Sequence, residues 1–381
     1  MEEQKKESSE ELFDSTLKLI KERQERAACG QLNHIPFPFE RSSGIFPGIE
    51  KSTYSIWGAA TGVGKSQFVR YLYVISVYDF LKKHPELDIK WKLFYFSLEE
   101  TKEKFMMTLI SHYLYVNHKL RIGVRQLRSV GKVGYYLPDD VIDKIEKARE
   151  YFQDLTKYVE IHHEIRNPTG WYKTVQSYLE AHGKWTYKEI FVDGKTKTVK
   201  DKFIHDDDQL YCMCIVDHLG LGLPEKSDGK LLSLHETIGL WSSRYAIDLR
   251  DRYNVILADI QQLNAASQEK QFTNRGASIV EKLEPSLDGL ATNKETARNA
   301  DNVFALFAPD RYGIEEYENY DIKRIQDHFR MLMILKSRDG ESNVRIPLYF
   351  DGAVNYFREL PKANDPMMAQ VYKKVELIYN E

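Results

Sequence analysis

A short glycine-rich segment between Ala59 and Ser66 combines residue types that bind phosphate groups. The segment AATGVGKS follows the apolar stretch TYSIW and precedes the apolar stretch QFVRYLYV, so a strand should lead into it and a helix should follow it. Glycines in such a loop let backbone N–H groups point at phosphate oxygens, and the helix N-terminus adds partial positive charge. The residues that we expect around the phosphates are Ala60, Thr61, Gly62, Val63, Gly64, Lys65, Ser66 and Gln67.

Two side chains of this loop have predicted roles of their own. Lys65 should contact the β and γ phosphates of a nucleoside triphosphate, and the Ser66 hydroxyl should bind Mg²⁺. Ala59 stands where the usual pattern has glycine, but it keeps a small residue where the chain must bend. A glycine-rich turn with an incidental lysine is the alternative, and the flanking strand and helix argue against it. The loop therefore predicts ATP and Mg²⁺ as ligands without defining a reaction.

Two carboxylates at the ends of predicted strands would supply that reaction. Asp217 ends the almost wholly apolar run LYCMCIVD, where a carboxylate can orient the water shell of Mg²⁺. A functional role is favoured for it because an unpaired buried carboxylate is costly. Glu99 follows KLFYFSL and, beside the loop, could polarise a water molecule for in-line attack on the γ phosphate. For Glu99 taken alone, a solvated helix cap is the better-supported alternative.

These residues need a parallel sheet whose strand ends converge on the loop. From Thr53 onward, apolar strands alternate with helical stretches, which is typical of a parallel sheet covered on both faces. Residues 101–183 are predicted to be largely helical. Asp351-Gly352 is predicted to form a two-residue hairpin turn that adds antiparallel strands. The predicted strands are TYSIW, KLFYF, LYCMCIV, NVILADI, NVFALF, FRMLMIL, VRIPLYF and VNYFREL.

Three further regions flank or interrupt this sheet. An amphipathic helix over about residues 10–27 places Phe13, Leu17 and Ile20 on one face, and docking on its own domain or on a neighbouring subunit is equally consistent with the pattern. The stretch KEIFVDGKTKTV predicts a surface hairpin turning at Asp193-Gly194. The expected organisation is a linker helix and tether (1–44), an ATPase domain (45–360) with a hairpin insertion near 185–208, and a polar tail with room for one short helix (361–381).

Composition limits the classes of protein that remain. The 381 residues are 42% hydrophobic, and 54 basic against 57 acidic residues give a net charge of -3, so any nucleic-acid site must be local. Three cysteines indicate a reducing compartment. A charged N-terminus and the lack of any run near roughly 18 apolar residues predict a protein without a membrane partner. We expect a cytoplasmic location, in a bacterium or in a phage-infected host cell.

Five sequence blocks occur in an order that carries a family resemblance. The blocks ATGVGKS, FYFSLEE, CIVDHL, DIQQLN and ILKSRDG, with ARNADNVFALFAPDRY before the last, resemble those of the hexameric replicative helicases of the DnaB type. The resemblance covers about residues 45–360. It implies an α/β fold, namely a RecA-like P-loop NTPase with a mainly parallel twisted sheet, helices on both faces and antiparallel strands at the C-terminal edge.

The resemblance also implies roles for individual residues. Glu99 becomes the catalytic base, Asp217 the carboxylate on the metal side, and Gln262 a polar sensor between the nucleotide and the DNA loops. Lys336 and Arg338 match a Lys-x-Arg pair that family members offer to the nucleotide of the adjacent subunit. Such cations would neutralise charge that grows on the γ phosphate and would make hydrolysis depend on ring assembly. A solvated strand end is the alternative for this pair.

Departures from the family limit what can be transferred. The N-terminal helical domain of bacterial members is missing, and only the helix near residues 10–27 stands in place of the family's linker. The resemblance implies that this helix packs on the next subunit. Contacts with a primase or a loader cannot be transferred, so these partners stay unidentified. Ala265 and Ala291 stand where many relatives have arginine, which puts the mode of DNA binding in doubt.

DNA-binding residues are expected in two loops that would line the channel of a ring. The first follows Asp217 and contains PEKSDGK, and the second runs from about residue 265 to residue 299. A few cations repeated in six copies suffice to make a positive channel. Solvated charges are the alternative for each of them. The candidate DNA-binding residues are Lys226, Lys230, Arg275, Lys294 and Arg298, with Lys270 in the same loop.

The leading hypothesis is therefore an ATP-driven replicative DNA helicase. It would form a homo-oligomeric ring, a hexamer by resemblance, translocate on single-stranded DNA 5′ to 3′ by analogy, and unwind forked DNA. The compact single-motor form indicates a mobile-element or phage replication protein. One alternative is a RecA-like recombinase or regulatory ATPase that forms filaments or static rings. Another is a non-catalytic ring or loader that uses nucleotide only to assemble, and Glu99 argues against it because such a protein needs no base.

Overall fold

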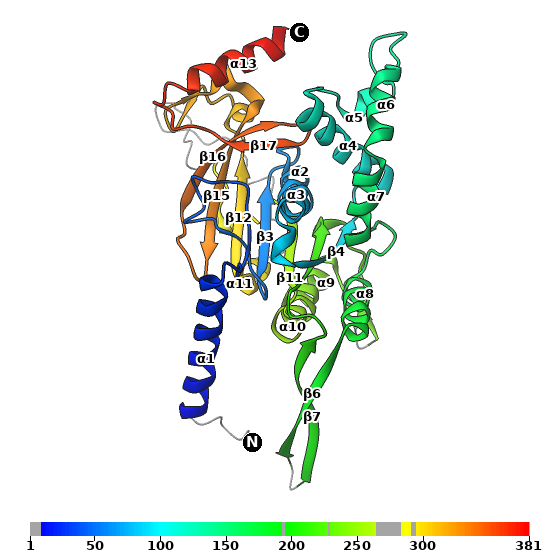
Figure 1. The fold of residues 1–381 in the computed structure, drawn as a ribbon, viewed down its shortest axis with the longest axis vertical. Helices are drawn as coiled ribbons and strands as arrows, with labels where there is room; N and C mark the ends of the chain where they lie inside the picture. Colours follow the sequence, from blue (N-terminus) through cyan, green and yellow to red (C-terminus); the bar gives the residue numbers. More distant parts are fainter. Residues whose placement is uncertain (1–8, 193–194, 228, 264–282, 291–294, 381) are drawn as a thin grey trace.

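The computed structural model shows one large sheet that organises the chain (Figure 1). It describes residues 9–192, 195–227, 229–263, 283–290 and 295–380. The strand order across the nine-stranded sheet is β17-β16-β15-β12-β3-β11-β8-β4-β5. Its strands are β3 (Tyr54–Ala59), β4 (Lys90–Ser97), β5 (Val159–His162), β8 (Leu210–Asp217), β11 (Ile256–Gln262), β12 (Asn302–Phe307), β15 (Phe329–Ser337), β16 (Val344–Asp351) and β17 (Tyr356–Glu359).

Six of these strands run parallel and three run antiparallel. Strands β12, β3, β11, β8, β4 and β5 pair in parallel, whereas β15, β16 and β17 alternate in direction. We call the two ends of the six parallel strands the carboxyl edge and the amino edge of the sheet. Because β15 is antiparallel to β12, its last residues lie at the amino edge. The predicted RecA-like architecture, with antiparallel strands at the C-terminal side, is confirmed.

Helices cover both faces of the sheet, as the alternation of its side chains requires. Along β8, Tyr211, Met213 and Ile215 belong to one core cluster, and the residues between them belong to a second cluster. The first cluster includes residues of α2, α3, α4 and α7, and the second includes residues of α8 to α11. The α-helices are α1 (Ser9–Ala28), α2 (Lys65–Arg70), α3 (Ser76–Lys83), α4 (Lys102–His118), α5 (Val124–Leu127), α6 (Asp139–Lys147), α7 (Arg149–Tyr158), α8 (Pro168–Ala181), α9 (Leu234–Leu240), α10 (Ala246–Tyr253), α11 (Glu295–Asn299), α12 (Ile322–Ile325) and α13 (Met368–Asn380).

Smaller two-stranded sheets decorate this core. The pair β6–β7 is by far the longest of them and corresponds to the predicted hairpin insertion. Figure 1 shows that this hairpin and α1 both extend away from the amino edge of the sheet. The remaining short strands are β1 (Ile35–Pro36), β2 (Gly48–Ile49), β6 (Gly183–Val192), β7 (Lys195–His205), β9 (Lys226–Ser227), β10 (Lys230–Leu231), β13 (Glu316–Tyr317) and β14 (Tyr320–Asp321).

Helix α1 leaves its apolar side chains uncovered by the rest of the chain. Phe13 is 65% exposed, and Leu12, Leu19 and Ile20 are also exposed. Near the end of the helix, Arg26 donates a hydrogen bond of 2.9 Å to the side-chain oxygen of Gln209. The predicted helix is therefore present, and it does not dock on its own domain.

Three details differ from the sequence predictions. Strand β5 lies inside the region predicted to be helical, where its four residues are too short to produce an alternating pattern. The turn between β16 and β17 has four residues, because Asp351 pairs with Tyr356 in the ladder. Asp351 is fully buried and is bound by Arg121, so it belongs to the strand and not to the turn.

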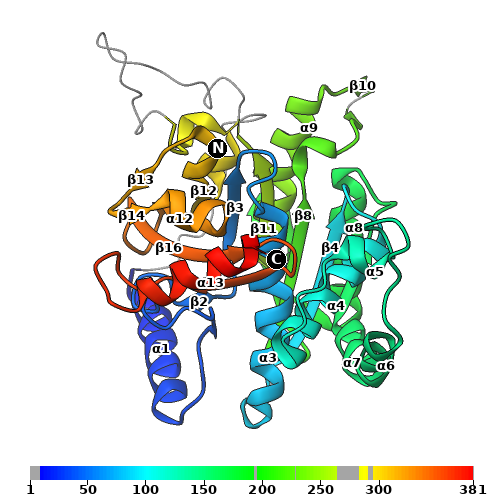
Figure 2. The ribbon, with the colours of Figure 1, turned by 90° about the horizontal axis from the view of Figure 1, so that it is seen from above.

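The C-terminal region is more than a polar tail. Helix α13 buries Met368, Val371, Tyr372 and Val375 in a third core cluster that lies under β15 and β16. Viewed from above, α13 lies across the sheet near β16 (Figure 2). Within the described residues, no helix is long and apolar enough to cross a membrane.

Candidate functional site

The glycine-rich loop joins the carboxyl end of the central strand β3 to the helix α2. Gly62 and Gly64 have φ angles of 77° and 99°, a region that favours glycine. At Gly64, a Cβ atom would come within 2.8 Å of the Phe350 ring, so a larger residue would also clash with the core beneath. The local sequence thus permits the sharp turn that points the loop backbone outward at the start of α2.

Ser66 and Asp217 meet at the carboxyl edge, although 151 positions separate them in the chain. The Ser66 hydroxyl donates a hydrogen bond of 2.8 Å to Oδ1 of Asp217, and the Tyr95 hydroxyl donates one of 2.8 Å to Oδ2. Asp217 is fully buried, and this burial raises its pKa, while the nearby Arg70 guanidinium acts in the opposite direction. A serine hydroxyl beside a carboxylate is an all-oxygen donor set of the kind that Mg²⁺ prefers, so these residues fit the predicted ion.

Lys65 and Glu99 lie near each other beside the loop. Lys65 is buried, and burial lowers its pKa, although the negative charges of Asp217 and Glu99 oppose that effect. Glu99 follows β4, is exposed, and forms no hydrogen bond or ion pair with the described part of the chain. Its neighbour Glu100 is instead bound to Arg70 on α2 at 2.7 Å. The arrangement leaves one carboxylate free to contact a ligand while the adjacent one fixes the backbone.

Gln262 contacts the loop from the end of β11. Its side-chain nitrogen donates a hydrogen bond of 2.5 Å to the Thr61 hydroxyl. Strand β11 lies next to β3 in the sheet, and Gln262 pairs in register with Ala59. The structure therefore brings Gln262 together with Lys65, Ser66, Glu99 and Asp217 at one edge, and the chain continues from Gln262 toward the predicted second DNA loop.

Two arginines that the sequence did not single out also hold the loop. Arg330 on β15 is buried and donates a hydrogen bond of 2.7 Å from Nε to the Val63 carbonyl oxygen, and burial lowers its pKa to about 10. Arg311, which follows β12, donates to the Thr61 carbonyl oxygen. A single charged residue inside the apolar run FRMLMIL was the available signal for Arg330. No comparable signal marked Arg311.

Lys336 and Arg338 lie at the amino edge, away from the loop of their own chain. Lys336 on β15 pairs with Val303, whereas Ala59 beside the loop pairs with Leu306 farther along the same strand. Lys336 Nζ donates hydrogen bonds of 2.8 Å and 2.6 Å to the carbonyl oxygens of Ala297 and Ala300, and also one to Arg298. The two cations therefore do not belong to the same site as the loop within one chain.

Arg338 is also engaged within its own chain. Its Nη1 lies 3.0 Å from Oδ1 of Asp301, although its side chain is 47% exposed. Asp301 is held independently by Arg250 at 2.9 Å and accepts a hydrogen bond from the Tyr54 backbone. Arg338 can therefore turn outward without leaving Asp301 unpaired.

The predicted DNA-binding residues are only partly described. Lys226 and Lys230 lie on the short ribbon β9–β10, where Lys230 is 3.3 Å from Glu236. Arg298 is exposed on α11. Arg275 and Lys294, together with Lys270, Ala265 and Ala291, lie outside the described residues. The described cations stay predictions for DNA contact.

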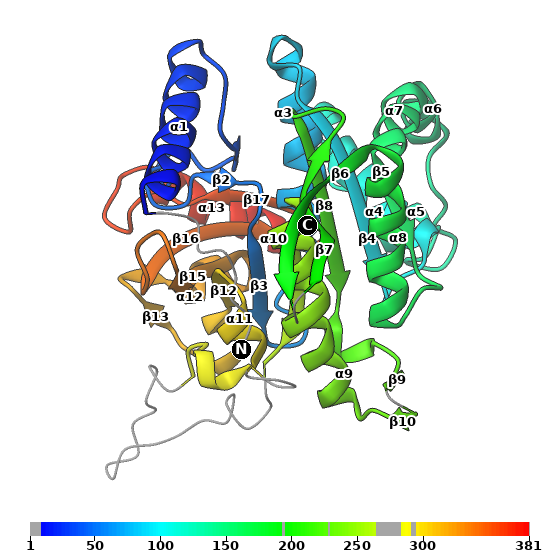
Figure 3. The same cartoon turned by 90° about the horizontal axis from the view of Figure 1, so that it is seen from below.

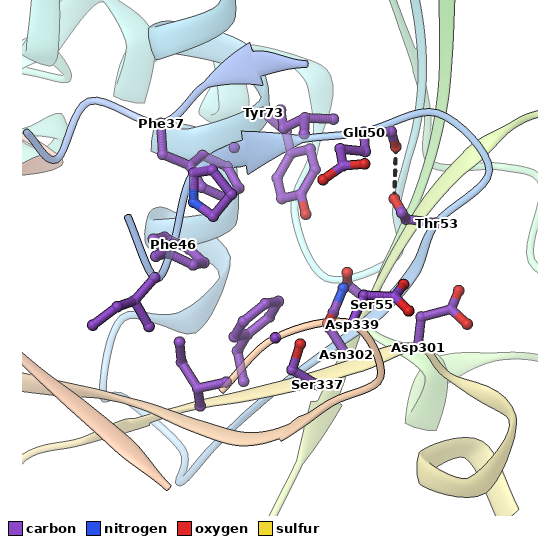
Figure 4. A pocket seen from close by; sticks show the side chains of 17 residues that line it. Phe37, Phe46, Glu50, Thr53, Ser55, Tyr73, Asp301, Asn302, Ser337 and Asp339 are labelled. Atoms are coloured by element: carbon purple, nitrogen blue, oxygen red, sulfur yellow. Dashed lines mark hydrogen bonds between the residues drawn. The ribbon is translucent and has the colours of Figure 1, made fainter. Parts of the chain in front are cut away.

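A separate cavity lies at the amino edge (Figure 4). It has a volume of about 140 Å³, with aromatic walls that include Phe37, Phe46 and Phe304 and polar groups from Ser55 and Asp301. Drug-sized ligands occupy pockets of roughly 300–1,000 Å³, so a nucleotide would not fit in it. The carboxyl edge, with the loop, is therefore the candidate site.

The fold and the loop together define a RecA-like ATPase architecture, and comparison with solved structures agrees. No protein-family model and no curated protein matches the sequence. The ATPase domain of a DnaB-like helicase matches with a TM-score of 0.64 at 15% identity, covering 91% of this chain and 98% of that one. A DnaB-like replicative helicase, described with its interactions with primase, matches with a TM-score of 0.63 at 16% identity, covering 91% of this chain and 67% of that one. The resemblance to DnaB-type helicases is confirmed at the level of the fold.

Proposed function

We propose that the protein is an ATP-dependent, ring-forming DNA helicase. The carrying observation is the hydrogen bond between Ser66 and Asp217 at the carboxyl edge, with the unpaired Glu99 beside Lys65. This combination has a place for the metal, a cation for the phosphates and a free base, as hydrolysis of a nucleoside triphosphate requires. The fold shared with helicase ATPase domains supports the choice among ATPases.

Each residue has a distinct task in the proposed reaction. Mg²⁺ held near Ser66 and Asp217 would neutralise charge on the β and γ phosphates. Lys65 donates hydrogen bonds to the same phosphates, and the loop backbone orients them. Glu99 accepts a proton from the attacking water. Gln262 contacts Thr61 in the loop and so couples the nucleotide to the chain that follows β11.

A second subunit would complete the site. Lys336 and Arg338 lie at the amino edge of their own sheet and so are available only to the nucleotide of a neighbour. The exposed apolar face of α1 supports the same assembly, because a helix with Phe13 and Ile20 in solvent gains stability when another subunit covers them. We propose a hexameric ring that translocates on single-stranded DNA 5′ to 3′.

Strand displacement on forked duplexes tests this proposal directly. Purified protein with ATP and Mg²⁺ is offered forks that have only a 5′ tail or only a 3′ tail, and release of the labelled strand is measured. We expect release from the 5′-tailed substrate. A protein that binds nucleotide normally but displaces no strand from either fork is not a helicase.

Two alternatives make different predictions about assembly. A recombinase or regulatory ATPase with the same fold would form filaments or static rings, which electron microscopy of the nucleotide-bound form distinguishes from rings that also unwind DNA. A non-catalytic ring or loader would bind nucleotide without turnover. The free Glu99 favours an active ATPase over this second alternative.

A further inference from the structure

The hairpin β6–β7 is a long ribbon that only its base attaches to the body. Its strands pair with each other and with no strand of the main sheet. At the base, Trp185 and Phe203 pack on the Tyr253 ring at centroid distances of 5.2 Å and 4.9 Å, and His205 hydrogen-bonds the Tyr253 carbonyl oxygen at 2.8 Å. Beyond this anchor the ribbon extends away from the body (Figures 1 and 3).

The outer part of the ribbon carries side chains that a solvated ribbon does not need. Tyr187 is 62% exposed and Phe191 is 64% exposed, although aromatic side chains gain stability by burial. An isolated two-stranded ribbon is also only marginally stable in water. A partner that covers these rings would resolve both features.

Charge indicates which kind of partner it is. Residues 183–205 contain six lysines against three acidic residues, in a chain whose net charge is -3. Among the described residues, Lys188 pairs with Asp201 and Lys200 with Glu180, whereas Lys195 and Lys197 have no acidic partner. A local positive excess on a negative protein is complementary to phosphate groups.

The two faces of the ribbon divide these chemistries. Cross-strand pairs share a face and alternate along the strands, so Tyr187 and Phe191 lie on one face, opposite Lys200 and Thr196. Lys188 and Lys197, opposite Val199 and Ile190, lie on the other face, and Lys195 follows Lys197 on the same side. One face can thus stack on bases while the other contacts phosphates.

We propose that the hairpin is a nucleic-acid-binding arm. Tyr187 and Phe191 stack on unpaired bases, and Lys188, Lys195 and Lys197 contact the phosphate backbone. The arm lies beyond the amino edge, so it is separate from the loops predicted to line a channel. It does not depend on ATP hydrolysis, and it can be present even if the protein is not a helicase.

Binding measurements without nucleotide test the arm. Fluorescence anisotropy is recorded for a labelled single strand and a blunt duplex between about 50 and 200 mM salt. In one variant, Tyr187→Ala and Phe191→Ala are combined, and we expect about tenfold weaker binding of the single strand with little change for the duplex. In another, Lys188→Gln, Lys195→Gln and Lys197→Gln are combined, and the salt dependence for the single strand should fall by about 2 in slope, since each phosphate contact contributes roughly 0.7.

A matched control separates the arm from general charge. The combination Lys132→Gln, Lys147→Gln and Lys373→Gln removes the same charge from exposed positions elsewhere and should leave the slope unchanged. The anchor residues are kept in every variant, and retained thermal unfolding verifies the fold. Unchanged affinity and slope in both hairpin variants would overturn the proposal. Unchanged DNA binding with a changed oligomeric state would overturn it too, and would assign the ribbon to contact between copies of the chain.

Discussion

The buried guanidinium of Arg330 holds the carbonyl oxygen of Val63, at 2.7 Å, in the middle of the phosphate-binding loop. The same guanidinium donates to the carbonyl oxygens of Asp327 and Phe329 and lies over the Phe350 ring. An antiparallel strand therefore fixes the conformation of a loop that belongs to the parallel part of the sheet. The loop is held in place by a residue that has no direct part in the chemistry.

Arg330→Met tests this support. The methionine fills much of the apolar space but leaves the Val63 carbonyl oxygen without its donor, so we expect about 1–3 kcal/mol of lost stability and weaker nucleotide binding. Equilibrium binding of a fluorescent nucleotide and urea unfolding measure the two effects. Arg345→Met on the neighbouring strand β16 is the control, because Arg345 pairs with Glu284 away from the loop. A folded Arg330→Met protein with undiminished nucleotide affinity would contradict the role.

Glu99→Gln tests the proposed base. The amide keeps the size of the side chain but cannot accept the proton, so turnover should fall by at least about 10²-fold while nucleotide binding is kept. Steady-state phosphate release and nucleotide titration measure the two quantities. Glu103→Gln, an exposed carboxylate in the first turn of α4, should be silent. Hydrolysis that continues unchanged in Glu99→Gln would remove the assignment.

Arg338→Ala tests the contribution from a neighbouring subunit. Variant subunits mixed with wild-type subunits should lower ATPase activity more steeply than their fraction, because each one disables the site of its neighbour. The substitution should not disturb folding, since Arg250 still holds Asp301. Arg324→Ala, which breaks an exposed pair with Glu376, is the control. A loss strictly proportional to the variant fraction would exclude a role in trans.

Asp259 should make stability depend on pH. Burial raises its pKa to about 7, with the Tyr54 hydroxyl and the Trp241 indole donating to the same oxygen. Because the folded pKa exceeds the unfolded value of about 3.9, its contribution is fully present below pH ~4 and is lost as pH rises toward 7, at about 1.4 kcal/mol per pH unit.

The variant Asp259→Asn isolates this contribution. The amide oxygen can accept both hydrogen bonds and carries no charge, so its stability relative to the wild type should increase between pH ~5 and ~7. Chemical unfolding of both proteins at several pH values provides the measurement. A constant difference across this range would show that Asp259 does not titrate there.

The sequence was sufficient for the parts of the fold that repeat a simple pattern. The eight predicted strands are all present because each is a long apolar run, and the strand-end positions of Asp217 and Gln262 follow from parallel pairing. The glycines of the loop mark a backbone conformation that few other residues adopt. These features are local, so a single sequence reveals them.

Contacts between distant segments could not be predicted in this way. Tyr95 binds Asp217 across two strands, and Lys336 binds the carbonyl end of α11, but nothing in either local sequence names the partner. Similarly, the packing of α13 depends on a core cluster formed by β15 and β16. Short elements such as β5 are missed because four residues hold too little pattern.

The placement of the loop and of Arg338 at opposite edges of one sheet also has a kinetic consequence. Under the proposed function, a dispersed subunit can hold ATP but lacks the cations that complete its site. ATPase activity per subunit should therefore rise with protein concentration until rings saturate, and dilution should lengthen the lifetime of bound ATP. The geometry of the sheet would thus protect the nucleotide from hydrolysis until the subunit has neighbours.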